Sequence, residues 1–536
     1  MKRPIKTIMI GAVAMLLAAT SCQKEETPAA QTGETISISI QGAIGDFTPA
    51  DGVKATTESV IRVMWEAGDK VYVYDGASNL GELTVSITDP KTSETDARYA
   101  YLTGTLTAPQ SGTTLLTLVY VRGAAEAPAI SNGKISLDIS AQSGNDFPFM
   151  LYATLPFETS MTKITNKFVP FQFATSVMKV NCANLVNQSG NITFASINEM
   201  NTVCVLTLNK AAAPTVSGTT AGTIVRTGEF PTGNGKGTVM VAAAPTAAVS
   251  SSKTRYVNIR HGDESYIGMQ LTNAELKAGS YYNTICFVKS KKPADQDCVL
   301  YCHGIWWAKE NLAITESGRR EFNGTGHVNG DYFQWAAYPG YCGNATDADK
   351  GLLVYNSFKS KKCGDGSSAF TFKSGKKFTT ANAPYYSDSE YQKYTSGSVN
   401  LEKSDDVANI ILGGNWRMPT AEEFNALKEA VYWAWDNTDC GYYVFMPGQG
   451  TSGSAGGRGS IADSDDKTKA ALFFPAAGYG VTSGFYNVGS DGYYWSSSLS
   501  SSDAGRAFSL TFSGSGVSPQ NSSSRYLGFT VRPVSD

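Results

Sequence analysis

The chain has 536 residues, with 44 Lys or Arg against 47 Asp or Glu, so its formal net charge at pH 7 is −3. This balance, without a basic cluster, argues against nucleic-acid binding. Charged residues make up only 17%, whereas the chain holds 53 Gly, 27 Tyr and 24 Phe. Aromatic and β-branched residues punctuated by glycine predict a mostly β, extracellular protein.

The first 22 residues have the pattern of an export signal rather than of a folded segment. Lys2, Arg3 and Lys6 precede an apolar run, residues 8–19, that is too short to span a bilayer. Small residues then lead to Cys22, and the stretch resembles a bacterial lipoprotein processing site in which Cys22 carries the lipid. An ordinary secretory cleavage beside an incidental cysteine is the alternative.

The following "QKEE" resembles the surface-export signal of Bacteroidota lipoproteins. It implies a surface-exposed lipoprotein of the cell outer membrane, anchored through its lipid. Residues 23–36 are interpreted as a polar linker.

From about residue 34 the sequence pattern predicts strands. "ETISISIQG" alternates apolar and polar residues at period two, as does the "KVYVY" that follows the turn at Gly68 and Asp69. Further runs of this kind, separated by turn residues and with little helical periodicity, predict two tandem antiparallel β-sandwiches. We place them at residues 37–165 and 166–290.

Four motifs in this region resemble the fimbrillin-like (Mfa-like) pilin family. They are the lipoprotein signal, "WEAGDKVYVY", "FQFATSVMKV" and the closing "LKAGSYY". The resemblance covers roughly residues 34–290. It implies a pilin in which a trypsin-like protease cuts after a basic residue beyond the first strand, and a strand from another subunit fills the groove. Lys54 and Arg62 are the candidate cleavage residues; alternatively, both are solvated loop charges and no cut occurs.

Residues 291–297 are charged and contain a proline, which predicts a linker. Apart from Cys22 the chain has eight cysteines, which permit disulfides without revealing their pairing. No Cys/His spacing suits a metal, and the three histidines are not placed for a hydrolytic triad. We therefore predict no catalytic residue, no metal and no cofactor.

The stretch "GGNWRMPTAEEFNAL", residues 413–427, concentrates charge at the start of a predicted helix. Thr420 followed three residues later by Glu423 predicts a capping box. Phe424, Leu427, Val431 and Trp435 then fall on one helical face, so the helix is expected to run to the Gly441 region. Arg417 is expected to form a structural ion pair rather than to act in catalysis.

Six ordered motifs beyond residue 298 resemble the Fibrobacter succinogenes major paralogous domain. These motifs, which end with "DGYYWSSSLSSSDAGRAFSLTF" and "YLGFTVRPV", span residues 298–536. That domain is related to the C-type-lectin-like and formylglycine-generating-enzyme folds, and the resemblance implies a compact α+β fold. Arg532 is expected to be paired internally. The cysteines lie outside the relatives' copper motif, and the calcium-binding tripeptides of sugar-binding lectins are absent.

With the copper and calcium motifs absent, we predict that this domain provides a binding surface. Residues 446–466 are rich in Gly and Ser and predict a flexible, exposed loop. Tyr beside Gly, Ser and Asn is the composition of adaptable binding surfaces, although ordinary packing is an equally good explanation for any one residue. The candidate ligand-binding residues are Tyr442, Tyr443, Phe485, Tyr486 and Tyr493, with Tyr494 in the same cluster.

In the pilin family, shaft subunits donate a C-terminal segment, whereas this chain ends in a predicted folded domain. The sequence therefore predicts a fimbrial (pilus) tip adhesin that accepts a donor strand and presents a lectin-like domain to a host or bacterial glycan or protein. The alternative is a surface glycan-binding lipoprotein that does not polymerise.

Overall fold

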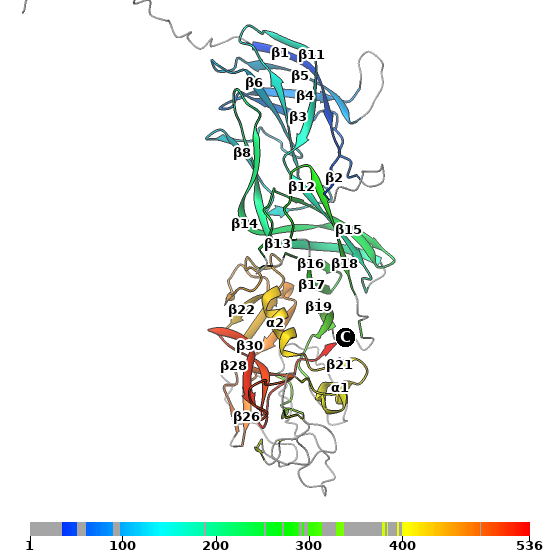
Figure 1. Ribbon diagram of the computed structural model, residues 1–536, viewed down its shortest axis with the longest axis vertical. Helices are drawn as coiled ribbons and strands as arrows, with labels where there is room; N and C mark the ends of the chain where they lie inside the picture. The colour runs from blue at the N-terminus through cyan, green and yellow to red at the C-terminus, as the bar shows by residue number, and fades with distance from the viewer. Residues whose placement is uncertain are drawn as a thin grey trace, which may run out of the picture.

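The computed structural model is elongated, with β-rich regions following one another along its long axis (Figure 1). It describes residues 35–50, 60–88, 97–186, 189–250, 253, 255–270, 273–288, 292–293, 298–312, 329–336, 378–380, 383, 394–395, 399–482 and 484–536. The predicted lipidation residue Cys22 and the cleavage candidate Lys54 lie outside these ranges. None of the described helices has the length and apolar character needed to cross a bilayer.

The N-terminal strands form a closed barrel, which corrects the predicted antiparallel sandwich. The strand order is β1-β11-β10-β6-β3-β4-β5, and β1 runs parallel to β11. Closing the sheet on itself covers the hydrogen-bonding edges that an open sheet would leave bare. The strands are β1 (Thr35–Ile44), β3 (Lys70–Tyr74), β4 (Asn79–Ser86), β5 (Tyr99–Thr107), β6 (Leu115–Val121), β10 (Met150–Pro156) and β11 (Lys163–Phe173).

A separate apolar core fills this barrel. Side chains alternate along each strand, so every second residue of β1 points inward. Trp65 lies at the centre, with its ring 5.1 Å from Tyr120 and 5.2 Å from Phe171. The predicted boundary at residue 165 falls inside β11, so the barrel extends beyond it.

A 15-stranded sheet follows, in the order β2-β18-β12-β15-β14-β13-β16-β17-β19-β20-β31-β21, with β7, β8 and β9 attached. Its first members are β2 (Thr48–Pro49), β7 (Ile130–Ser131), β8 (Lys134–Asp138), β9 (Ala141–Gln142), β12 (Ser176–Ala183), β13 (Ser189–Thr207), β14 (Thr215–Gly233), β15 (Lys236–Ala243), β16 (Tyr256–His261), β17 (Glu264–Gln270) and β18 (Ser280–Phe287). Residues 48–49 and 130–142, which the sequence assigns to the first domain, therefore pair with this second sheet.

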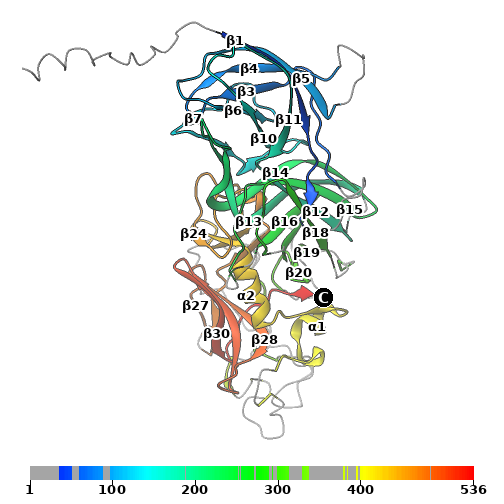
Figure 2. The ribbon, with the colours of Figure 1, turned by 45° about the horizontal axis from the view of Figure 1, so that its top comes forward.

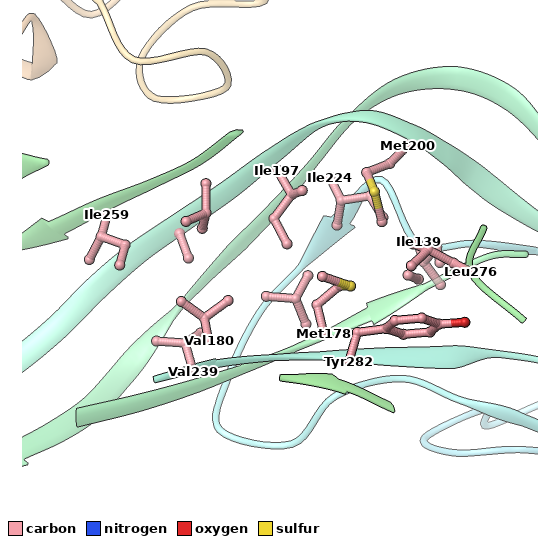
Figure 3. Packing of buried hydrophobic residues seen from close by; sticks show 14 of the residues in the cluster. Ile139, Met178, Val180, Ile197, Met200, Ile224, Val239, Ile259, Leu276 and Tyr282 are labelled. Carbon is pink, nitrogen blue, oxygen red and sulfur yellow. The ribbon is translucent and has the colours of Figure 1, made fainter. Parts of the chain in front are cut away.

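The core of this second region lies between two layers of strands. Figure 3 shows Ile197 of β13 on the side opposite Met178 of β12 and Val239 of β15. All three side chains are fully buried. The layers are held together by aliphatic contacts, which depend on area removed from water rather than on direction.

The sheet continues across the predicted linker into the C-terminal region. Strand β17 pairs in parallel with β19 (Cys298–Cys302), which forms a hairpin with β20 (Ile305–Ala308). Strand β31 (Val534–Ser535) then pairs with both β20 and β21 (Trp416–Arg417). Within the linker, Lys292 forms an ion pair with Glu264 at 2.9 Å. The two regions therefore share one hydrogen-bonded sheet.

Within the described residues, the C-terminal region combines two short helices with three small sheets. The helices are α1 (Val407–Leu412) and α2 (Ala421–Ala430), with 3₁₀ turns η3 (Lys403–Asp405) and η4 (Lys467–Lys469). The sheets comprise β22 (Tyr432–Asp436), β23 (Gly441–Phe445), β24 (Arg458–Ser460) and β25 (Leu472–Pro475); β26 (Tyr479–Val481) and β27 (Gly484–Tyr486); and β28 (Asp491–Leu499), β29 (Arg506–Ser513) and β30 (Gly516–Ser524).

Helix α2 ends earlier than its apolar pattern predicts. Residues 432–436 form strand β22 instead of two further helical turns, and Val431 already has extended dihedrals. The aromatic residues of "YWAWD" favour a strand, and β23 and β24 offer partners on both sides. Tertiary pairing has therefore outweighed the helical spacing.

Arg532 is buried in the C-terminal core and is bonded internally, as the sequence predicts. Its guanidinium donates to Oδ1 of Asn311 at 2.8 Å and to the carbonyl oxygens of Lys309 and Phe473 at 2.7 Å. It also lies 4.5 Å from the ring centroid of Phe474. Burial lowers the pKa of Arg532 to about 10. One forked side chain thus ties three backbone segments together.

Replacing Arg532 by lysine should destabilise this region by about 2–4 kcal/mol, because an ammonium group cannot reproduce the planar fork and leaves buried acceptors unpaired. Urea unfolding followed by tryptophan fluorescence measures the effect, since seven of the eight tryptophans lie beyond residue 300. The exposed Arg458→Lys is the control and should change little. Equal midpoints for both variants would contradict the prediction.

Candidate functional site

The charged stretch at residues 413–427 is an architectural feature. Thr420 Oγ1 accepts from the Glu423 N–H at 3.1 Å, and Glu423 Oε2 accepts from the Thr420 N–H at 2.8 Å, which completes the predicted capping box. Arg417 donates to both carboxylate oxygens of Glu423, at 2.8 and 2.6 Å, and to Asp536 at 2.6 Å. The ion pair fixes the start of α2 beside β31, and Arg417 is internally paired as the sequence predicts.

At the other end of the molecule, β1 occupies a slot between two strands. It pairs antiparallel with β5 from Thr35 to Ala43 and parallel with β11 from Ser37 to Ile44. Its inward-facing isoleucines are 1–4% exposed; they are Ile36, Ile38, Ile40 and Ile44. Burying four such side chains contributes roughly 6–12 kcal/mol. A single strand therefore fills an apolar, hydrogen-bonded groove.

The chain leaves β1 along a path that also touches the second sheet. Phe47 stacks on Phe173, with ring centroids 3.7 Å apart, and β2 pairs with β18. Of the two cleavage candidates, Arg62 is described: it is exposed, but it lies between Ile61 and Val63, which are 6% and 3% exposed. Cleavage there requires this short stretch to leave its packing.

Three of the predicted ligand-binding residues are buried, which corrects the prediction for Tyr442, Tyr443 and Phe485. Their exposed fractions are 0%, 6% and 4%. The Tyr442 hydroxyl donates to the carbonyl of Ser513 at 3.0 Å, and the Tyr443 hydroxyl donates to Asp439 at 2.7 Å. Pairing of β23 with β22 and β25 places these rings inside the molecule. Tyr494 is likewise fully buried.

The Gly/Ser-rich segment, residues 446–466, is held against the fold rather than free. It contains β24, which pairs with β22. An added side chain at Gly453 would lie within 2.1 Å of the Tyr432 ring, and one at Gly448 would meet Val225 at 2.3 Å. The glycines therefore allow close packing against an aromatic ring and against the second sheet, whereas Ser452 and Ser454 between them are exposed.

Tyr486 and Tyr493 remain at the surface, joined by Tyr479. Tyr486 is 45% exposed, and Tyr493 is partly exposed. The ring of Tyr479 stacks on Tyr486 at 5.9 Å and meets Tyr493 edge-on at 4.8 Å. These three rings form a continuous row, which we call the tyrosine row. No sequence signal indicated that Tyr479 belongs to this row, because its position beside Tyr486 depends on the pairing of β26 with β27.

A hollow of about 350 Å³ lies beside this row, on one face of the β28-β29-β30 sheet. Tyr493 is common to the tyrosine row and the hollow. The lining is mostly small and polar; it comprises Asp491, Tyr493, Thr511, Phe512, Ser513, Gly516, Val517, Ser518 and Asn521. This combination of an aromatic wall and a polar floor is suited to holding a small polar ligand.

A second hollow, of about 450 Å³, lies near the turn between β22 and β23. Lys467 forms ion pairs there with Asp436 and with Asp439. A single lysine thus bridges two carboxylates and balances one of their two charges. Among the described residues, no group of three or more His, Cys, Asp or Glu side chains could hold a metal ion. Cys440, at the end of this turn, is disulfide-bonded.

Comparison with known proteins gives a limited result. No family model and no curated protein matches the chain. Solved structures give partial matches. A protein from Bacteroides uniformis, proposed to act in cell adhesion, is 15% identical with a TM-score of 0.29, covering 47% of this chain and 92% of its own. A similar protein from Bacteroides fragilis is 16% identical with a TM-score of 0.32, covering 48% and 95%.

The fimbrial anchor protein Mfa2 from Porphyromonas gingivalis is 12% identical with a TM-score of 0.23, covering 42% of this chain and 78% of its own. The structural neighbours are thus adhesion and fimbrial proteins. At these identities and TM-scores, the likeness carries no weight in assigning a function.

The Asp436–Lys467 pair should make the stability of the C-terminal region pH-dependent. Burial by itself raises the pKa of Asp436, but bonds from Lys467 and from the Asp439 and Thr438 N–H groups outweigh it, so the pKa is lowered. A lowered folded-state pKa stabilises the fold above the unfolded value near 4, and this stabilisation is lost as the pH falls below it.

Lys467→Met should therefore reduce the unfolding free energy at pH 7 by about 1 kcal/mol, and the difference from the wild type should shrink as the pH falls below the unfolded value near 4. Thermal unfolding between pH 2 and pH 7 measures this, with the neighbouring exposed Lys469→Met as the control. A deficit that stays constant over the whole pH range would contradict it.

Proposed function

We propose that the chain is a surface-anchored adhesin that accepts a donor strand from another pilus subunit and presents its C-terminal region for binding. The observation that carries this proposal is the position of β1, an apolar strand hydrogen-bonded on both sides within the barrel. Because β1 lies N-terminal to both candidate cleavage residues, a single cut separates it covalently from the rest of the fold.

Loss of β1 would leave both hydrogen-bonding groups and apolar pockets of the barrel without partners. The edges of β5 and β11 would lose their hydrogen-bonding partners, and the pockets of four isoleucines would open to water. A strand from another subunit with apolar residues at alternate positions would satisfy both, which is strand addition to an exposed sheet edge. The buried pockets would set its register, because a one-residue shift turns the apolar side chains outward.

Release of the N-terminal segment would also affect the second sheet. Strand β2 pairs with the edge strand β18, and both Lys54 and Arg62 follow β2 in the chain. A cut at either residue therefore detaches β1 together with β2. The acceptor groove of this proposal runs from the barrel onto the second sheet.

The shape of the molecule suits a terminal position in a polymer. The barrel with β1 lies at one end, and β28 and β30 lie toward the opposite end in both views (Figures 1 and 2). An acceptor groove at one end would direct the C-terminal region away from the neighbouring subunit. We propose that this region, with the lectin-like resemblance noted in its sequence, is the binding domain of a pilus tip.

A second function, a surface glycan-binding lipoprotein that never polymerises, is favoured by one observation. The barrel is complete with its own β1, and Ile61 and Val63 on either side of Arg62 are buried, which protects that site from a protease. The two functions differ in whether β1 leaves.

The test is the N-terminus of the protein on the cell surface, measured by mass spectrometry. Maturation by a trypsin-like protease should give Ala55 or Val63, and Lys54→Ala or Arg62→Ala should abolish the corresponding product. Acylated Cys22 on all of the protein would favour the second function.

Strand exchange is tested on the cleaved protein with a biotinylated peptide carrying the sequence of residues 35–49. The peptide should replace β1 and stay bound, whereas the same peptide with Ile38→Asp should not, because a carboxylate would enter an apolar pocket. Equal retention of the two peptides would contradict the acceptor groove.

A further inference from the structure

We propose that the tyrosine row and the adjoining hollow on the β28-β29-β30 sheet bind a hexopyranose unit of a glycan without a metal ion. This inference rests on the proposed function, since it names the class of ligand that the C-terminal region would take. It is independent of whether the chain polymerises, because the site lies far from β1 (Figure 1).

Strand alternation separates the two faces of this sheet. Tyr493 pairs with Thr511, which pairs with Ser518, and these side chains line the hollow. On the opposite face, the neighbouring Tyr494 and Leu510 are fully buried in the C-terminal core. The face of Tyr493 also carries Trp495 and Ser509, which are fully buried, so this face is open only at the end of the sheet that holds the hollow.

The hollow exists because small residues occupy the centre and far side of the open face. Asp491 pairs with Ser513, which pairs with Gly516, so this set of cross-strand neighbours ends at a residue that has no side chain. Beside these short groups stands the large ring of Tyr493. The result is a shallow trough bounded by an aromatic wall and by Asn521 on β30.

The tyrosine row has the exposure that a stacking surface needs. Tyr486 is one of the few large hydrophobic side chains exposed on the described surface, at 45%, and Tyr479 packs against it. A ligand that covers this ring would remove its apolar area from water. A pyranose ring offers a flat face of C–H groups that matches an aromatic ring in shape.

Two polar contacts at the site are long. The Asn487 amide lies 3.5 Å from the Tyr493 hydroxyl, and the Ser490 hydroxyl, which donates to the Asn487 carbonyl at 3.1 Å, lies 3.5 Å from Oδ2 of Asp491. The two distances of 3.5 Å are at the limit of a hydrogen bond, so the Asn487 amide and the Asp491 carboxylate have capacity for shorter bonds. Burial also raises the pKa of Asp491, against the effect of its Ser490 and Asn487 bonds. Sugar hydroxyls would supply donors to this partly desolvated carboxylate.

The charge and size of the hollow select among ligand classes. Its lining contains a carboxylate and no cationic side chain, which disfavours phosphate, sulfate and acidic sugars. A volume of about 350 Å³ is at the lower end of small-molecule sites, whereas a stable protein partner would cover roughly 800 Å² of surface. A neutral sugar unit, with an apolar face and hydroxyl groups, fits both the charge and the volume of the hollow.

The experiment uses the uncleaved full chain and a panel of neutral methyl glycosides: glucoside, galactoside, mannoside, fucoside, N-acetylglucosaminide and N-acetylgalactosaminide. Saturation-transfer NMR identifies binders, and titration calorimetry gives the affinity. At least one glycoside should bind with a Kd on the order of millimolar, as expected for a small open site. Adding EDTA should leave the affinity unchanged.

Tyr486→Ala and Asp491→Asn should each weaken that binding by about tenfold or more, which corresponds to the loss of one stacking surface or one charge-assisted hydrogen bond. Tyr99→Ala is the matched control, because Tyr99 is 44% exposed on the barrel, and it should bind like the wild type. Both site variants change surface residues, and thermal unfolding checks that they remain folded.

The proposal is overturned if no glycoside binds, if EDTA abolishes binding, or if both site variants bind like the wild type. None of these outcomes depends on β1, so a failure here leaves strand acceptance standing. Conversely, glycoside binding by a chain that retains acylated Cys22 would support the site while overturning the pilus role.

Discussion

Closure of the N-terminal barrel depends on β1, which supplies hydrogen bonds to both β5 and β11 and fills the core with isoleucine. A backbone edge buried without a partner is costly, so each edge in a folded chain must be paired or exposed to water. Here the partners come from distant parts of the sequence. Strand β2 covers β18, and β31 joins β20 to β21. Edge pairing therefore couples the beginning, the middle and residues 534–535 of the chain.

The same coupling explains why charged residues that look reactive are structural. Arg417 joins the capped start of α2 to Asp536, and Arg532 links three backbone segments from within the core. A buried guanidinium needs several acceptors, and it finds them most readily where separate segments converge. Such residues hold the C-terminal sheets in place, and the open face of β28-β29-β30 rests on that support.

The two ends of the molecule differ in their chemistry. The slot of β1 is apolar and lined by strand edges, so under the proposed function it would select a partner by backbone pairing and by the spacing of its side chains. The hollow beside Tyr493 is small, polar and aromatic, so it would select a ligand by its hydroxyl pattern and one flat face. The two proposed sites would therefore take different kinds of ligand without competition.

Local sequence determined the features that depend on neighbouring residues: the alternation of β1, the capping box of Thr420 and Glu423, and the β-rich character of the chain. It did not determine where α2 ends or which tyrosines are exposed. Tyr442 and Tyr493 both stand beside another tyrosine and a glycine, yet Tyr442 lies in the core and Tyr493 faces the hollow. Barrel closure, too, required β1 to meet β11. Only the tertiary structure decided these points, because burial and pairing depend on segments that no local pattern contains.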